Sequence, residues 1–293
     1  MTRRFAVFIV SGGRAGRVKT LRALQSSGYK GDYHIICDDQ DRTLSDYQKE
    51  HPGRVIVFSK EKYQKKTDEM DNFGAGKVVV YARNSCWDIA ADLGLTHFLV
   101  LDDDYTSFRF RFDKHGNFGS WYVRDFDQLC DAALDYLDET LFLSVALAQG
   151  GDYIGGGKST KLSSRIAWRK VMNSFFCRTD RPFQFMGRIN EDTNAYTVLG
   201  NRGDLFLTIV PAQLTQTQTQ ANAGGLTDAY LESGTYVKSF YTVMLTPSCC
   251  KVSPMGDGHF RLHHWIKWRD AVPHIIREQH RKPRAALGVA DMS

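Results

Sequence analysis

The stretch "FLVLDDDYTSF" at residues 98–108 contains an apolar run that ends at three adjacent aspartates, Asp102, Asp103 and Asp104. Four consecutive apolar residues are typical of a strand that is buried on both faces of a parallel sheet. Three neighbouring carboxylates repel one another unless a positive charge lies among them. The stretch therefore predicts a central strand with a cation site at its carboxyl end. The alternative is an Asp-rich turn or helix cap without a ligand.

Segments on the N-terminal side fit the same kind of sheet. Apolar runs of strand length lie at 5–10, 33–37, 54–58 and 97–101. Helical periodicity separates them at 15–28 and 84–95, whereas the polar stretch 59–72 is expected to be a surface loop. This alternation indicates an α/β fold, Rossmann-like, with a mostly parallel central sheet that helices cover on both faces.

Polar loops follow three of these strands. Ligands of such sheets bind beyond the carboxyl ends of the strands, so we expect the three loops to line one crevice. The loop residues are Ser11, Gly12, Gly13 and Arg14, then Asp38 and Asp39, then Asp102–Asp104. The first loop precedes a helix, and its backbone N–H groups are expected to bind anionic or uracil oxygens. It lacks P-loop spacing, and a tight strand-to-helix turn is its alternative. Asp38 or Asp39 is expected to accept a hydrogen bond from uracil or ribose, a solvated turn being the alternative.

The pattern changes after Asp104. The segment "FRFRFDKHGNFGSWYV" (108–123) alternates apolar and charged residues about a turn, which predicts an antiparallel hairpin. Helices are expected at 124–139, 190–203 and about 228–245, strands at 141–147 and 205–210, and a loop at 213–220. We therefore expect an N-terminal half (1–112), a smaller antiparallel and helical lobe (113–278), and a disordered basic tail (279–293).

The composition is that of a soluble globular protein, with 42% hydrophobic and 24% charged residues. No apolar run approaches the ~20 residues that span a bilayer, and the apolar start is too short for a signal peptide. We expect a cytoplasmic protein without a membrane partner. Six cysteines without CxxC spacing indicate reduced, buried thiols. The net charge of +5 permits a polyanionic partner without demonstrating one.

The aspartates also carry a resemblance. An apolar strand followed by Asp-x-Asp (Asp102, Asp104) resembles the signature of GT-A glycosyltransferases, which use nucleotide-sugar donors. "FIVSGGR" (8–14) resembles the first strand and nucleotide loop of that fold, and "YARNSCWDIA" (81–90) resembles the arginine-bearing helix over the donor. "MGRINEDTNAY" (186–196) resembles the Glu-Asp segment that places the catalytic base under the acceptor.

A narrower family resemblance uses four segments. "LDDDY", "INEDTNAY", "GNRGDLFLT" and "HFRLHHW" together resemble the TET/base-J-associated glycosyltransferases of phages and kinetoplastids. Those enzymes add sugar to 5-hydroxymethylpyrimidines in DNA. The resemblance implies a GT-A fold whose first half binds the nucleotide sugar and whose second half binds the acceptor and carries the catalytic group.

Metal and donor roles follow from the carboxylates and from the resemblance. Mn²⁺ or Mg²⁺ is usually held by one or two carboxylates plus substrate phosphates. Asp104 is the first choice as ligand, Asp102 contacts the metal or the ribose, and Asp103 does either or orients the loop. The fold often adds a late histidine, here His259 or His263, with His264 as the alternative; His263 and His264 can instead open the last helix. Arg83 and Asn84 map to nucleotide or diphosphate contacts.

Catalytic and acceptor roles are assigned in the second half. Asp192 is expected to be the general base and Glu191 to anchor the acceptor or sugar, with the reverse assignment open. Acids in a first helical turn are also favoured by the helix dipole alone. Basic and aromatic residues are expected to contact DNA, although scattered surface and core positions explain them equally. They are Arg109, Arg111, Lys158, Lys161, Arg165 and Trp168.

The predicted function is a metal-dependent, inverting glycosyltransferase that moves a hexose, glucose from UDP-glucose, to hydroxymethylpyrimidine in double-stranded DNA. One alternative keeps the chemistry but uses a protein, glycan or small-molecule acceptor. A nucleotidyltransferase, which also uses Asp-rich strands, is a second. A binding module without catalysis is the third, and the intact aspartates and Glu-Asp pair argue against it.

Overall fold

The computed structural model describes residues 2–71, 78–158, 171–216, 237–255 and 261–271. Its strands are β1 (Phe5–Val10), β2 (Asp32–Asp38), β3 (Val55–Phe58), β4 (His97–Asp102), β5 (Tyr105–Phe112), β6 (Phe118–Tyr122), β7 (Ser144–Ala148), β8 (Ser174–Arg178), β9 (Phe206–Gln216), β10 (Cys250–Met255) and β11 (Arg261–Ile266). Its helices are α1 (Lys19–Ser26), α2 (Leu44–Glu50), α3 (Lys60–Lys66), α4 (Val80–Asp92), α5 (Phe126–Glu139), α7 (Glu191–Asn201) and α9 (Trp268–Ala271), with 3-10 turns η1 (Gly150–Tyr153) and η2 (Gly156–Lys158).

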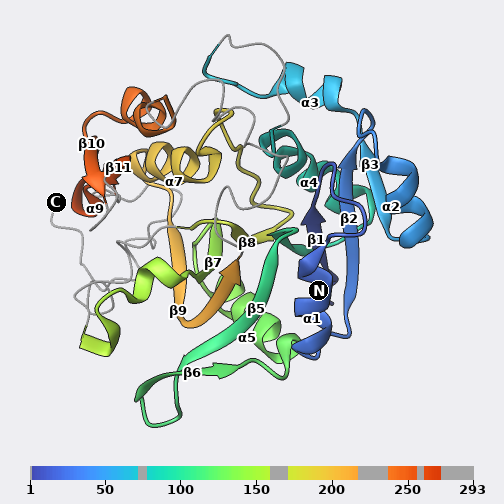
Figure 1. Cartoon of the computed structure of the whole chain (residues 1–293), viewed down its shortest axis with the longest axis horizontal. Helices are drawn as coiled ribbons and strands as arrows, with labels where there is room; N and C mark the ends of the chain where they lie inside the picture. The colour runs from blue at the N-terminus through green and yellow to red at the C-terminus, as the bar shows by residue number, and fades with distance from the viewer. Residues whose placement is uncertain (1, 72–77, 159–170, 217–236, 256–260, 272–293) are drawn as a thin grey trace, which may run out of the picture.

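Nine of these strands form one mixed sheet in the order β3-β2-β1-β4-β8-β7-β9-β5-β6 (Figure 1). The N-terminal strands β3, β2, β1 and β4 pair in parallel, as the alternation of strands and helices predicts. Beyond β4 the pairing is antiparallel except between β7 and β9. The α/β fold with a helix-flanked sheet is thus confirmed, while the sheet is mixed, being parallel throughout its first part and only between β7 and β9 in its second.

The core lies on both faces of this sheet, which explains the continuous apolar strands. Alternate side chains of a strand point to opposite faces. Phe8 and Phe98 pack with α4 and the segments around α7, whereas Ile9 and Leu99 pack with α1 and α5. Each strand therefore needs apolar residues at every position.

Two segments that read as polar loops are regular elements. Helix α3 occupies much of the predicted loop 59–72, because Ser59 caps it by accepting a hydrogen bond from Lys62 N at 3.4 Å. Strand β9 extends to Gln216, so its end occupies the start of the predicted loop 213–220. Pairing with β5 satisfies this polar backbone, which composition alone hides.

Two further elements differ from expectation. Strand β8, which sequence reasoning passed over, inserts the buried residues Phe175 and Phe176 between β4 and β7. His263 and His264 lie on β11, which pairs with β10 as an antiparallel hairpin. They therefore do not open the last helix, which begins at Trp268.

Several predicted positions lie outside the described residues. They are His259, Lys161, Arg165, Trp168 and the tail 279–293, together with the side chain of Lys158. Residues 237–245 of the helix expected at 228–245 are helical. The boundary expected at 112 falls in the β5–β6 hairpin, and strands from both sides of it share one sheet. Among the helices that the structure describes, none has the length and apolar character to cross a bilayer.

Candidate active site

The three aspartates lie in the tight connection between β4 and β5, at the carboxyl end of β4. Val10 of β1 pairs with Asp102, so the loop after β1 lies directly beside them. Helix α1 supports the connection through Thr20, whose hydroxyl donates to Asp102 O at 2.6 Å and accepts from Tyr105 N at 3.0 Å. The expected convergence of these two loops is therefore present.

Asp103 holds the two loops together. It is only 4% exposed and accepts hydrogen bonds from Ser11 Oγ at 2.5 Å and from Arg14 Nη1 at 2.6 Å. Burial raises the pKa of Asp103, and Arg14 and Ser11 oppose that shift. Because both oxygens are engaged, this geometry supports loop orientation among the roles considered for Asp103.

The loop after β1 does not offer the row of free N–H groups that its sequence suggests. Ser11 N donates to Ile36 O at 3.1 Å, Gly13 N to Asp41 Oδ2 at 2.6 Å, and Arg14 N to Tyr47 Oη at 2.9 Å. Partners on β2 and around α2 accept from these three groups, and the expected contact of the loop with anionic or uracil oxygens stays a prediction. The loop also positions Asp103.

Asp41 and Tyr47 were not among the predicted site residues. Asp41 belongs to the acidic run after β2, which is a signal that could have found it. Tyr47 is fully buried beneath the loop, where its hydroxyl also lies 2.6 Å from Ser11 Oγ. Its position at the centre of a short polar helix gives no comparable signal.

In the acidic loop after β2, the two predicted residues Asp38 and Asp39 have different contacts. Asp39 accepts from Lys60 N at 3.0 Å and so supports the start of α3. Asp38 accepts from Gln40 N at 2.9 Å, and burial raises its pKa. Asp38 lies at the end of β2 and stays the candidate for a hydrogen bond to the donor.

Arg83 connects the aspartate loop to the Glu-Asp segment. Its Nη2 donates to Asp102 Oδ1 at 2.8 Å, and its Nη1 forms an ion pair with Glu191 Oε1 at 2.6 Å. The side chain is 2% exposed, and its guanidinium lies over the rings of Phe175 and Phe185. The two carboxylates raise the pKa of Arg83 despite its burial. This geometry favours a positioning role over the predicted contact with the diphosphate.

Asn84 likewise has partners within the protein. Its Nδ2 donates to Thr67 Oγ1 at 3.0 Å and to Phe185 O at 2.9 Å, and its Oδ1 accepts from Phe185 N at 2.8 Å. The amide therefore joins α4 to the segment after β8. The structure gives Asn84 this bridging role, and the donor contact stays a prediction.

Glu191 and Asp192 form the first turn of α7, both buried. Asn190 precedes them in the left-handed conformation (φ 56°), which turns the chain into the helix. Burial raises the pKa of Glu191 to about 7, although Arg83 opposes the shift. Asp192 Oδ1 accepts from Thr193 N at 2.7 Å. Since Glu191 is paired with Arg83, Asp192 is the less encumbered carboxylate, which agrees with its predicted role as base.

The β10–β11 hairpin brings a histidine to the start of α7. His264 is buried, and its Nδ1 lies 3.5 Å from Asn190 Nδ2. The ring of His263 lies 4.2 Å from that of His264, centroid to centroid. Within the described ranges, no three or more His, Cys, Asp or Glu side chains gather as a metal site. Of the predicted ligands, Asp102, Asp104 and His263 do not form such a group there, and His259 lies outside the described residues.

Asp104 nevertheless has the character of a cation ligand. Burial, together with Asp102 and Asp103, raises the pKa of Asp104 to about 7, and Arg14 and Lys19 oppose the shift. A partly buried carboxylate with this excess of negative charge fits a divalent cation that takes most of its other ligands from phosphate oxygens and water. Asp104 and the partly exposed Asp102 would hold such an ion.

A second polar network, absent from the sequence predictions, supports α7 from the other side. Arg188 pairs with Asp71, and Tyr241 donates to Asp71 Oδ2 at 2.6 Å. The same Tyr241 hydroxyl also lies within hydrogen-bond distance of Glu69 O, so the two acceptors share its one proton, and Tyr81 donates to Glu69 Oε1. This network ties the segment before α7 to the start of α4, two residues before Arg83.

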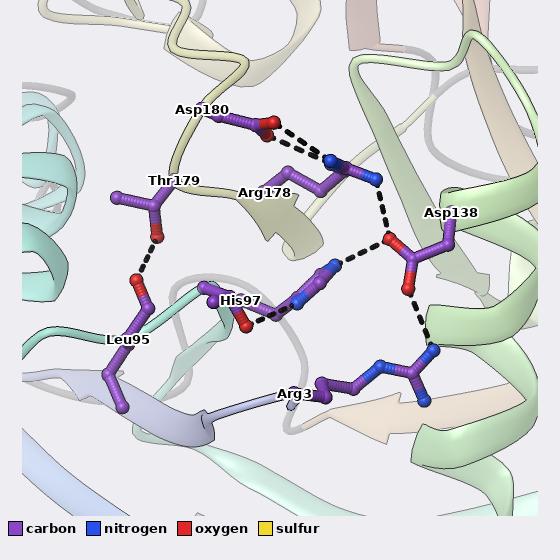
Figure 2. Close-up of a pocket in the computed structure, with 8 residues that line it drawn as sticks. Arg3, Leu95, His97, Asp138, Arg178, Thr179 and Asp180 are labelled. Atoms are coloured by element: carbon purple, nitrogen blue, oxygen red, sulfur yellow. Dashed lines mark hydrogen bonds and ion pairs between the residues drawn. The ribbon is translucent and has the colours of Figure 1, made fainter. Parts of the chain in front are cut away.

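A polar pocket of about 540 Å³ lies at the amino end of β4, the end opposite to the aspartates (Figure 2). Asp138 accepts there from His97 Nε2 at 2.8 Å, Arg178 Nη1 at 2.6 Å and Arg3 Nη2 at 2.7 Å. Arg178 also pairs with Asp180. These groups satisfy one another far along the strand from Asp102, so the pocket is not part of the aspartate site.

Comparisons with known proteins give the family. A family model described as TET-Associated Glycosyltransferase matches residues 5–225. No curated protein matched the sequence.

Solved structures show weaker likenesses. A mannosyltransferase from Pyrobaculum calidifontis, in complex with GDP-Man and Mn²⁺, is 13% identical with a TM-score of 0.47, over 75% of this chain and 59% of its own. Glucosyl-3-phosphoglycerate synthase from Mycobacterium tuberculosis, with Mn²⁺ and UDP-glucose, is 10% identical with a TM-score of 0.46, over 90% and 87%. TarS from S. aureus is 11% identical with a TM-score of 0.45, over 74% of this chain and 37% of its own. The chain thus spans less than two thirds of the mannosyltransferase.

The family match extends from β1 through the aspartate loop, Arg83 and the Glu-Asp segment to the residues just beyond β9. It therefore includes all nine strands of the main sheet. The chain belongs to the TET-associated glycosyltransferase family.

Proposed function

We propose that this glycosyltransferase is metal-dependent and inverting, and that it transfers glucose from UDP-glucose to the hydroxymethyl group of 5-hydroxymethylpyrimidine in DNA. The observation that carries the proposal is the buried link from Asp102 through Arg83 to Glu191. Through Arg83, the aspartates that we propose to hold the metal and diphosphate are linked to a second pair of acids. An inverting transfer needs those two groups on either side of the sugar.

The donor end of the site is the aspartate loop. Asp104 and Asp102 would hold Mn²⁺ or Mg²⁺, which offsets the charge that develops on a departing diphosphate. Asp103, held by Ser11 and Arg14, keeps this loop in place. Asp38, at the end of β2, is the proposed acceptor of a hydrogen bond from the nucleoside.

The acceptor end is the first turn of α7. Asp192 is proposed to take the proton from the primary alcohol as its oxygen attacks the anomeric carbon. Base catalysis of this kind typically contributes about 10²- to 10⁴-fold in rate. Glu191, paired with Arg83, fixes the helix turn that carries Asp192.

Hydroxymethylpyrimidine in DNA is proposed as the acceptor because the family resemblance implies it. A net charge of +5 is compatible with a polyanionic substrate. A sugar on this group would occupy the major groove, where proteins read base edges.

Radiolabelled transfer tests the proposal directly. The protein is incubated with UDP-[¹⁴C]glucose, Mn²⁺ and matched duplexes that contain hydroxymethylcytosine, hydroxymethyluracil or neither. Label on a hydroxymethylated duplex alone is the expected result, with UDP as the other product. If no duplex is labelled with any of a panel of nucleotide sugars, the proposal that DNA is the acceptor is rejected. Release of pyrophosphate from a nucleoside triphosphate would instead indicate a nucleotidyltransferase.

A further inference from the structure

The β5–β6 hairpin carries arginines that no carboxylate neutralises. In the part of the chain that the structure describes, most buried or partly buried arginines pair with an acid, namely Arg3, Arg14, Arg54, Arg83, Arg178 and Arg188. The partly buried Arg109 and Arg111 and the exposed Arg124 form no such pair within those ranges, and the partly buried Arg181 donates to backbone carbonyls instead. Aromatic rings hold the first three, which leaves their charge available to a ligand.

The rings set the positions of these guanidinium groups. Arg109 Cζ lies 4.0 Å from the centroid of Tyr122, and Arg124 Cζ lies 5.5 Å from the same ring. Arg111 Cζ lies 4.5 Å from the ring centroids of both Phe118 and Tyr153. A guanidinium stacked on a ring keeps the N–H groups at its edge for hydrogen bonding.

The arginines share one face of the sheet. Arg109 pairs across the strands with Tyr122 on β6 and with Gln213 on β9. Arg111 Nη1 donates to Gln213 Oε1 at 2.9 Å. On the opposite face, Phe108 and Val123 are buried in the core with α5. The arginine face is exposed at Tyr122, which is 52% exposed, whereas Arg111 is partly buried between Phe118 and Tyr153.

This hairpin holds much of the positive charge of the chain. Residues 105–124 contain three arginines and Lys114 against one acid, Asp113, a net +3 out of the chain's +5. Asp113 is engaged in the turn, where it accepts from His115 N and Asn117 N, each at 2.8 Å. It does not neutralise the arginines.

The hairpin is continuous with the aspartate site. Strand β5 begins at Tyr105, directly after Asp104, and its neighbour β6 is an edge strand of the sheet (Figure 1). Arg109 lies five residues beyond Asp104, which corresponds to about 16 Å at the rise of a strand. That length equals the axial rise of about five phosphates along one DNA strand.

We propose that this face, defined by Arg109, Arg111, Arg124 and Tyr122, binds the phosphate backbone of the nucleic-acid acceptor. The inference rests on the proposed function in so far as DNA is the acceptor. Planar guanidinium groups form paired hydrogen bonds with phosphates, and a row of them follows a repeating polyanion better than a single anion. The face directs the bound strand along β5 toward Asp104.

Charge removal tests this face. Arg109→Gln, Arg124→Gln and the double variant are assayed for binding to a hydroxymethylated duplex over a range of salt concentrations. Each substitution is expected to weaken binding about tenfold and to reduce the slope of log Kobs against log salt by about 0.9. Affinity for UDP-glucose with Mn²⁺ and the Tm are expected to stay those of the wild type.

Arg54→Gln is the matched control. Arg54 also stacks on a ring, with its Cζ 5.0 Å from the centroid of Tyr33, but it pairs with Asp32 at the far end of the sheet. It is expected to leave DNA binding unchanged. Tyr122→Leu should weaken binding as the arginine variants do, whereas Tyr122→Phe should retain it because the ring remains.

The outcomes separate this inference from the proposed function. If the double variant keeps the DNA affinity and salt slope of the wild type, the proposal that this face binds the phosphate backbone is rejected, even if DNA is glucosylated. A loss no larger than that of Arg54→Gln would likewise reject it. Binding that depends on Arg109 and Arg124, without sugar transfer to DNA, would support the face and reject the proposed acceptor.

Discussion

Three adjacent aspartates have three different environments, although the sequence presents them as equivalent. Asp102 contacts Arg83, Asp103 is buried against Ser11 and Arg14, and Asp104 has a pKa raised to about 7. A carboxylate whose charge is disfavoured in the free protein is stabilised when a cation binds. Asp104 is therefore the residue at which metal binding and stability are most closely linked.

Asp104→Asn is expected to abolish turnover and the rise in Tm that Mn²⁺ causes in the wild type. Without metal at pH 8 it is expected to raise the Tm by about 2 °C, because it removes a charge that the fold disfavours. The raised pKa means that the wild type loses stability as pH rises from about 4 to 7. The gain should therefore disappear at pH 4. Asp92→Asn, an exposed position on α4, is the control, and equal metal responses in the two variants would contradict the role of Asp104.

Arg83 is the second residue whose role is set by its contacts. Arg83→Met leaves Asp102 and Glu191 without their cation, and loss of one buried partner costs about 3–5 kcal/mol. Denaturant unfolding should show that decrease, and Glu191→Gln in the same background should recover part of it. Arg54→Met, which breaks an exposed pair, should cost less than about 1 kcal/mol. Equal losses in the two arginine variants would mean that the buried link contributes little.

At the scale of elements, α1 and α2 organise a site that they do not themselves form. Thr20 of α1 bonds both sides of the aspartate loop, and Tyr47 of α2 bonds the loop after β1. Residues of β2, α2 and the loop between them thus accept hydrogen bonds from N–H groups of the loop after β1. Helix α4 extends this pattern through Arg83, because it reaches both β4 and α7.

Thr20→Val tests this support because valine keeps the shape of threonine and removes its hydroxyl. Tyr105 N would lose its partner in a buried position, at a cost of about 1–3 kcal/mol in unfolding free energy. Calorimetry should also show weaker Mn²⁺ binding, since the loop is less well placed. In Thr140→Val the lost hydroxyl bonds only the preceding turn of α5, so metal binding should be unaffected. Unchanged Mn²⁺ affinity in Thr20→Val would contradict the positioning role.

At the scale of the whole molecule, the two ends of β4 carry different polar clusters. The carboxyl end of β4 carries the three aspartates. At its amino end lie charged side chains that pair with one another around Asp138 (Figure 2). That cluster joins the N-terminal arm, β4, β8 and α5, which are distant in sequence. We interpret it as a structural clasp whose contribution depends on pH.

Burial lowers the pKa of His97, although Asp138 opposes the shift. The unfolded chain then takes up a proton at His97 near pH 6.5 and the folded chain only at a lower pH, so stability falls as pH decreases below 6.5. His97→Gln is expected to reduce this loss between pH 6.5 and 5 in thermal melts. His115→Gln, in the exposed hairpin turn, should keep the wild-type slope. A steeper slope in His97→Gln would contradict the assignment.

The sequence by itself determined the elements whose signals are local. Continuous apolar runs identified β1 to β4, and the alternation about "HGN" identified the β5–β6 hairpin, whereas the roles assigned to Asp102–Asp104 and Glu191–Asp192 stay predictions. The strand predictions succeed because periodicity and composition act over a few residues. The polar helix α3 and the end of β9 were missed because capping and strand pairing outweigh composition there.

Only the tertiary structure decided which polar groups remain available to a ligand. Arg83 and Asn84 read as donor contacts, yet their partners lie in β4, α7 and the segment after β8. Ser11 meets Asp103, 92 residues away, and Gly13 meets Asp41. A polar group in a buried loop bonds whatever the fold brings within reach, and no local pattern encodes that partner.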